Sequence, residues 1–92
     1  MRPELLAQLK REGYSDFKQL EGHGTCALLK FAFTTGIVCT IDEYGYSGRY
    51  CYEHEADARA ALQAWDGTGH PTGPWIKAKG WGVDLLNPEL TA

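Results

Sequence analysis

The sequence predicts an α+β fold: an N-terminal helix, a three-stranded antiparallel meander, a second helix on the same sheet face, and an irregular packed C-terminal tail. Two observations predict this order. Apolar residues recur at helical spacing in two segments, and between these segments they alternate with a period of two. A chain of 92 residues has the size of one domain, so we expect residues 1–92 to form a single unit.

The first helix is predicted over residues 3–12. Pro3 suits the first helical turn, and Gly13 is a natural end for the helix. One helix face is apolar and is formed by Leu5, Leu6 and Leu9. A second short turn is predicted over residues 15–20, with Ser15 as its cap.

Three strands are predicted over residues 26–33, 37–43 and 49–53. The three residues between the first two strands end in a glycine, which suits a hairpin loop. Such a loop pairs Phe33 with Ile37, and it places the alternating apolar side chains of both strands on one buried face.

The third strand carries two tyrosines at alternating positions. Tyr50 and Tyr52 are expected to extend the buried face of the sheet. A two-residue turn before this strand would also place Asp42 opposite Arg49, as a cross-strand ion pair.

The second helix is predicted over residues 55–66. Its apolar residues follow the i, i+3, i+4, i+7 spacing and are Ala58, Ala61, Leu62 and Trp65. The tail, residues 67–92, is rich in glycine and proline, which predicts mostly irregular structure. Trp75 and Trp81 indicate that this tail packs on the body of the domain.

The composition limits the classes of function. The hydrophobic fraction of 43% argues against disorder, and the net charge of -3 argues against binding nucleic acid mainly through a basic surface. No apolar run approaches the roughly 20 residues of a membrane span, and the N-terminus lacks a signal-peptide core. Three cysteines do not suit a secreted disulfide framework. We therefore expect a cytoplasmic protein with free thiols, no membrane contact and no cofactor.

The candidate binding residues lie in the tail and in the second hairpin. If residues 75–81 are extended, Trp75, Lys77, Lys79 and Trp81 share one face. Indoles anchor protein interfaces, and an indole beside an ammonium group also suits a stacked base and its phosphate. The alternative is that the tryptophans cap the small core and the lysines lie along them. Tyr46 and Arg49 form a second candidate cluster, with hairpin packing as its alternative.

Two cysteine–histidine pairs have the spacing of half a zinc site: His23-x-x-Cys26 and Cys51-x-x-His54. The predicted strands place Cys26 and Cys51 on the outer sheet face but on strands that are not neighbours, with His54 pointing the other way. We therefore expect no metal site. Cys51 beside His54 also resembles a nucleophile with its base, although no third residue that would orient the pair can be placed.

Several segments carry a resemblance to a known group. They are Phe31-Ala-Phe-Thr-Thr-Gly-Ile-Val, Gly45-Tyr-Ser-Gly-Arg-Tyr-Cys-Tyr, Ala60-Ala-Leu-Gln-Ala-Trp-Asp-Gly, Gly73-Pro-Trp-Ile-Lys-Ala-Lys-Gly and the final Asn87-Pro88. The chain resembles small bacterial proteins without an established activity, some of them encoded near prophage or plasmid genes. The resemblance implies a free-standing domain in a mobile-element context.

The predicted order of elements also resembles the double-stranded-RNA-binding domain. That family places a basic start of the second helix against phosphates. Here the corresponding residues, 53–57, read Glu-His-Glu-Ala-Asp and would repel phosphate. The resemblance therefore extends to the topology and not to the activity.

These observations favour a small non-catalytic binding module that engages another protein. The alternative is a nucleic-acid-binding protein that uses the tryptophan–lysine strip and Arg49, and the third interpretation is a small enzyme that uses Cys51. A homodimer is compatible with the predicted outer face, whose apolar residues need a cover from the tail or from a second copy. They are Cys26, Leu28, Ala32, Val38 and Cys51.

Overall fold

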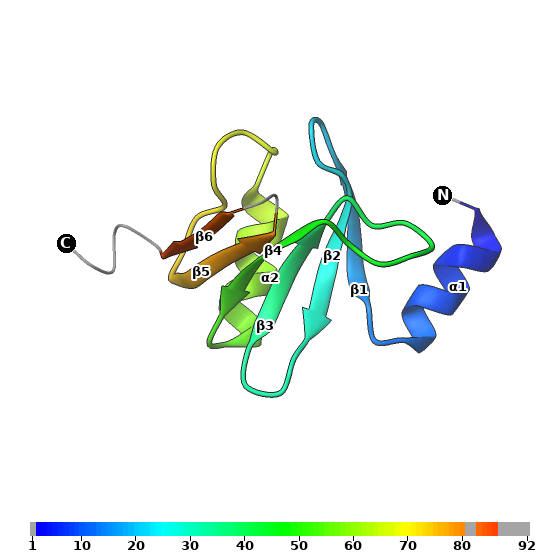
Figure 1. Cartoon of the computed structure of the whole chain (residues 1–92), viewed down its shortest axis with the longest axis horizontal. Coiled ribbons are helices and arrows are strands. Elements are labelled where there is room, and N and C mark those ends of the chain that lie inside the picture. Colours follow the sequence, from blue (N-terminus) through cyan, green and yellow to red (C-terminus); the bar gives the residue numbers. More distant parts are fainter. Residues whose placement is uncertain (1, 81–82, 87–92) are drawn as a thin grey trace.

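The computed structural model describes residues 2–80 and 83–86, and it describes side chains for residues 2–80. It contains an antiparallel sheet of six strands in which every strand lies next to its neighbour in sequence (Figure 1). The elements are α1 (Pro3–Arg11), β1 (Ser15–Leu20), β2 (Gly24–Lys30), β3 (Thr35–Cys39), β4 (Gly48–Tyr52), α2 (Glu55–Ala64), β5 (Trp75–Gly80) and β6 (Val83–Leu86). The α+β class is confirmed, but the prediction of a three-stranded meander is wrong.

Residues 15–20 form strand β1 and not a turn. Phe17 and Leu20 are three residues apart, which places them on one face of a helix but on opposite faces of a strand. The structure uses the second arrangement: Leu20 belongs to one buried cluster of the domain and Phe17 packs against the other. The strand begins with an irregularity between Ser15 and Lys18, where Asp16 has a φ of 56°. This bulge accounts for the turn-like residues at the start of the segment.

The tail also adds strands to the sheet. Residues 75–80 pair with β4 and residues 83–86 pair with β5, so this part of the tail widens the sheet and crosses neither sheet face. The irregular part lies in residues 65–74, as the glycines and prolines predict. Three side chains tie this connection to the body. The Tyr52 hydroxyl donates to Thr72 O, the Trp65 Nε1 donates to Thr68 O, and the Tyr50 hydroxyl pairs with His70 Nδ1.

The register of the first predicted hairpin is wrong. Leu28, and not Phe33, pairs with Ile37, and the loop covers residues 31–34. Phe33 lies at the tip of this loop and is 92% exposed. The alternation rule fails here because β2 is buried on both faces. Cys26 and Leu28 join one buried cluster and Ala27 joins the other.

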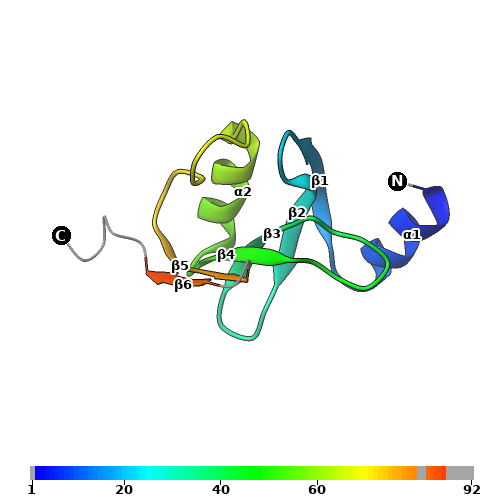
Figure 2. The ribbon, with the colours of Figure 1, turned by 45° about the horizontal axis from the view of Figure 1, so that its top comes forward.

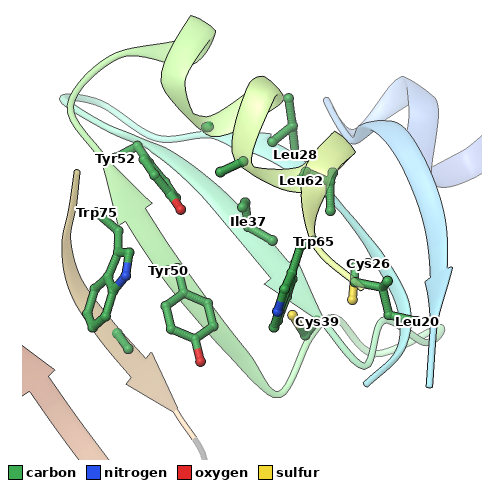
Figure 3. Close-up of a cluster of buried hydrophobic side chains, with 13 residues drawn as sticks. Leu20, Cys26, Leu28, Ile37, Cys39, Tyr50, Tyr52, Leu62, Trp65 and Trp75 are labelled. Atoms are coloured by element: carbon green, nitrogen blue, oxygen red, sulfur yellow. The ribbon is translucent and has the colours of Figure 1, made fainter. Parts of the chain in front are cut away.

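One face of the sheet, here called the inner face, is covered by α2. Figure 3 shows Tyr50, Tyr52 and Trp75 on this side of the sheet, with Leu62 and Trp65 from the helix and its end. All five belong to one buried cluster, so the expected placement of the two tyrosines on a buried face is confirmed. The other members of the cluster are Leu20, Cys26, Leu28, Ile37, Cys39, Ala58, Ala61 and Ala78.

The opposite face, here called the outer face, is partly covered by α1 and by the loop of residues 40–47. Leu9 of α1 packs in one cluster with Ala27, Val38 and Ile41, on the side of the sheet away from α2. The prediction that both helices pack on the same face is therefore wrong. Figure 2 shows α2 above the sheet, and the loop between β3 and β4 reaching towards α1. Arg2 and Glu43 form an exposed ion pair at that point.

Candidate binding surface on the outer sheet face

A bulge in β5 decides which candidate residues share a face. Cys51 of β4 pairs with Lys77, but the next residue, Tyr52, pairs with Trp75, so β5 holds one extra residue between them. An extra residue reverses the alternation of side chains. Trp75 therefore faces the inner cluster and is 3% exposed, whereas Lys77 lies on the outer side with Cys51.

The prediction that Trp75 shares a face with the lysines is therefore wrong. The Trp75 ring meets the Tyr50 ring edge-on, with centroids 5.2 Å apart, and lies 5.4 Å from the ring of His70. The alternative that this indole caps the core is the one observed. Trp81, the fourth member of the predicted strip, lies outside the described residues.

The same pairing brings the lysines beside Arg49. Arg49 stands opposite Lys79 and Cys51 stands opposite Lys77, so three cationic residues occupy neighbouring positions on the outer face of β4 and β5. Directly opposite residues of an antiparallel pair have Cβ atoms about 5 Å apart. The predicted pairing of Arg49 with Asp42 is wrong. Arg49 pairs with Val38, and Asp42 instead forms an isolated bridge with Gly45.

Arg49 is held in place by two aromatic residues. Its Cζ atom lies 4.5 Å from the centroid of the Phe31 ring, and its Nη1 donates a hydrogen bond of 2.7 Å to the Tyr46 hydroxyl. The Tyr46 ring meets the Phe31 ring edge-on, with centroids 6.4 Å apart. These contacts fix a side chain that would otherwise sample many rotamers. Tyr46 is half-buried by them and is not a free loop tip.

Gly36 makes room for this arrangement. A Cβ atom at position 36 would lie 2.7 Å from Cε2 of Phe31, closer than van der Waals contact allows. The ring therefore lies directly against the backbone of β3, with the guanidinium above it. We call Gly36, Phe31, Arg49 and Tyr46 the Arg49 stack.

The surroundings of Arg49 favour the charged form of its guanidinium. Burial of the guanidinium disfavours its charge, but the hydrogen bond with Tyr46 and the neighbouring Cys51 thiol outweigh this, and the pKa of Arg49 is raised. Its Nε atom is buried and makes no hydrogen bond within the described part of the chain. A buried, unpaired donor costs about 1–3 kcal/mol, so the site is not optimised for stability alone.

No carboxylate of residues 2–80 neutralises this cationic face. The ion pairs of the described side chains involve Arg2, Lys30 and Arg59, and none involves Arg49, Lys77 or Lys79. In the backbone register, Asp84 of β6 stands opposite Lys79. Three cations are thus concentrated on one face of a protein whose net charge is -3, with one acidic position beside them on β6.

The cysteines do not meet the histidines as the spacing suggested. Cys26 lies in the inner cluster, where its thiol contacts that of Cys39; this hydrogen bond lowers the pKa of Cys26 and raises that of Cys39. Cys51 lies on the outer side and is 2% exposed. The prediction that Cys26 and Cys51 share the outer face is wrong. His54 is exposed at the start of α2.

The imidazole of His23 lies over the Trp65 ring, with centroids 4.7 Å apart. Its Nε2 lies 2.9 Å from Gly67 O. Within residues 2–80 and 83–86, no three histidine, cysteine or acidic side chains are grouped so that they could hold a metal ion.

Sequence reasoning named Tyr46, Arg49, Lys77 and Lys79 but missed the residues that support them. Phe31 was expected on the buried sheet face, and Gly36 was expected to act only as a loop residue. The signal for Gly36 was present, because a glycine inside a strand often marks a close approach of another group.

The comparisons with known proteins add no relative. No family model, curated protein or solved structure matches this chain. Neither described helix has the length and apolar character needed to cross a membrane.

Proposed function

We propose that this protein is a non-catalytic binding module that engages another protein through the outer sheet face. The binding surface consists of Phe31, Tyr46, Arg49, Lys77 and Lys79, here called the outer-face patch. One observation carries the proposal: Arg49 is fixed by uncharged neighbours, with Lys79 opposite it and Lys77 two residues further along β5, and none of the ion pairs of the described side chains involves any of the three. The backbone register places one acidic residue, Asp84 of β6, opposite Lys79.

The residue types of the patch favour a protein as the partner. Arginine, tyrosine and phenylalanine are enriched at protein interfaces, and arginine and tyrosine are frequent among the residues that carry most of the binding energy. A residue that is already immobilised loses little entropy when the partner binds. The Arg49 stack meets this condition, because its aromatic contacts exist without the partner.

Nucleic acid is the alternative, and the charge disfavours it. With three phosphate contacts, the logarithm of the binding constant would fall with the logarithm of the salt concentration with a slope of only about -3. The acidic remainder of the chain also repels a polyanion. Trp75, which was to provide base stacking, is buried in the core. An enzyme that uses Cys51 is disfavoured by the burial of that thiol, since a nucleophile must reach its substrate.

The biological setting rests on the sequence resemblance alone. We infer a cytoplasmic protein encoded in a mobile-element context, for which a host protein is the natural partner. A homodimer remains an alternative partner, and the outer-face patch would then meet an acidic surface on a second copy.

Affinity capture from host lysate, with and without nuclease, tests the proposal. The informative variant is Lys77→Glu/Lys79→Glu, and the matched control is Lys10→Glu/Arg11→Glu, which changes the charge equally at exposed residues of α1. We expect a nuclease-resistant protein that is lost with the first variant and kept with the second. Equal loss with both variants, or loss on nuclease treatment, would refute the proposal.

A further inference from the structure

We infer that the outer-face patch recognises an acidic segment of the partner protein, and that Arg49 binds a carboxylate of that segment through both of its terminal nitrogens. This inference rests on the proposed function and identifies the chemistry that the partner must present. It makes Arg49 the specificity-determining residue of the patch and assigns Lys77 and Lys79 a supporting role.

The first step is that the Arg49 guanidinium is oriented before the partner binds. The Phe31 ring supports it from below and the Tyr46 hydroxyl holds Nη1, while Gly36 lets the ring lie against the sheet. A planar guanidinium presents its donors in a fixed fork, and that fork matches the two oxygens of a carboxylate.

The second step is that the Arg49 guanidinium has more hydrogen-bond donors than its neighbours in the protein occupy. Tyr46 accepts one hydrogen bond from Nη1, and the Cys51 thiol is the other polar side chain that interacts with the guanidinium. A guanidinium has five N–H donors, so these two neighbours leave further donors for a ligand. None of the described ion pairs involves Arg49. The Tyr46 hydroxyl accepts this hydrogen bond as an uncharged group. It therefore orients the guanidinium without neutralising the positive charge that would attract an external anion.

The third step concerns the lysines. Lys79 of β5 stands opposite Arg49 of β4. Lys77 lies two residues before Lys79 on β5, so these two positions are about 7 Å apart. The same spacing separates alternate side chains of an extended peptide. The patch therefore fits an extended segment with acidic residues at alternate positions, and not a single isolated carboxylate. An ammonium is a point charge without a fork, so the lysines attract the segment but do not select its geometry.

The test is an NMR titration of the intact protein with a synthetic peptide of alternating glutamate and serine, at low salt. The comparison probes are the peptide with glutamine in place of glutamate and a ten-nucleotide oligothymidine. The variants are Arg49→Lys, which keeps the charge and removes the fork, and Lys79→Arg, which is its matched conservative change. Amide shifts away from β4 and β5 report that each variant is folded.

We expect saturable binding of the glutamate peptide to the wild type and no binding of the glutamine peptide. Arg49→Lys should weaken binding at least about tenfold, which corresponds to the loss of one charge-assisted hydrogen bond. Lys79→Arg should change it less than about threefold. Equal effects of the two variants, no binding of the glutamate peptide, or tighter binding of oligothymidine would overturn the inference.

The two proposals can fail separately. If the captured protein depends on Lys77 and Lys79 but is retained equally by Arg49→Lys, the binding module stands and the carboxylate-binding role of Arg49 is wrong. If capture is insensitive to the outer-face variant, the proposed function itself fails.

Discussion

The guanidinium carbon of Arg49 lies 4.5 Å from the centroid of the Phe31 ring, which joins the loop between β2 and β3 to the outer face of β4. This contact links two segments that are 18 residues apart in sequence. It depends on a glycine beneath the ring and a tyrosine beside it. The arrangement has the character of a prepared binding site, in which neighbouring side chains fix the orientation of the binding group.

Replacing Gly36 with alanine should loosen this stack with little loss of stability. The new Cβ would lie 2.7 Å from Cε2 of Phe31 and would push the ring away from the sheet. Alanine is favoured over glycine in a strand by about 0.5–1 kcal/mol, which offsets part of the clash. We expect the free energy of unfolding to change by less than about 1 kcal/mol, and the aromatic ring-current shifts of the Arg49 side-chain protons to decrease.

Phe31→Leu provides the reference for that experiment, because it removes the ring current from position 31 altogether. Arg49 shifts that are identical in the wild type and in Gly36→Ala would contradict the described packing of the ring on the glycine.

Replacing Gly80 with alanine should disrupt the pairing of β4 and β5. Gly80 has a φ of 98°, and a Cβ atom there would collide with Ser47 O and lie 2.6 Å from the Cα of Gly48. Both are backbone atoms, so no side-chain rotation can relieve the clash. We expect a loss of more than about 2 kcal/mol in the free energy of unfolding, measured by urea denaturation.

Gly22→Ala is the matched control for Gly80→Ala. Gly22 has a comparable φ of 82° but has nothing within 4 Å of the added Cβ. Gly22→Ala should lower the free energy of unfolding by only about 1 kcal/mol, because it strains the backbone and meets no neighbouring atom. A cost for Gly80→Ala no greater than that of Gly22→Ala would show that β4 and β5 are not as close as described.

Lys18 should contribute to stability by closing the end of α2. Its Nζ donates to three backbone carbonyls, those of Leu62 at 2.9 Å, Gln63 at 3.0 Å and Trp65 at 2.6 Å. These are carbonyls that a helix end leaves without partners, and a cation there also complements the helix dipole. We expect Lys18→Met to lower the free energy of unfolding by about 1–2 kcal/mol. Lys10→Met, at an exposed position in α1, should change it by less than about 0.5 kcal/mol, and equal effects would refute this role.

The buried tyrosines should make the fold sensitive to alkaline pH. Tyr52 is fully buried and donates a 2.7 Å hydrogen bond to Thr72 O, and burial raises the pKa of its hydroxyl above the ordinary value of 10.0. The folded state therefore holds its proton at a pH where the unfolded state has begun to lose it. The contribution of the protonated Tyr52 hydroxyl to the free energy of unfolding is complete below about pH 10 and is lost progressively above it.

Urea denaturation between pH 8 and pH 11 measures this effect. We expect stability to fall above about pH 10 in the wild type, and to fall less steeply in Tyr52→Phe, which cannot ionise there. Tyr44→Phe changes a side chain that is 91% exposed and should reproduce the wild-type decline. Identical slopes in Tyr52→Phe and the wild type would contradict the assignment to Tyr52.

The sequence predicted the elements whose periodicity is strong and missed those that begin or end irregularly. Both helices and the three central strands were expected within a few residues of their observed bounds. Strand β1 was missed because its bulge at Asp16 resembles a turn. Strand β5 was treated as tail, because the glycines and prolines before it predict irregular structure, and its pairing with β4 is a long-range property.

The candidate surface illustrates the same limit. Arg49 and the two lysines were recognisable as candidate binding cations, but their proximity follows from the β4–β5 register. The bulge before Lys77 directs the Trp75 side chain into the core. The local alternation of residues does not reveal such a bulge. The faces of β2 were misassigned for a related reason, since burial on both sides removes the alternation that the prediction used.

Site-specific photo-crosslinking tests the outer-face patch as a protein-binding surface most directly. A photoreactive amino acid is placed at position 77 in the patch or, as the control, at position 63, an exposed residue of α2. The proposed function predicts a nuclease-resistant protein adduct from position 77 and none from position 63. Equal protein adducts from both positions, or an adduct from position 77 that nuclease removes, would contradict it.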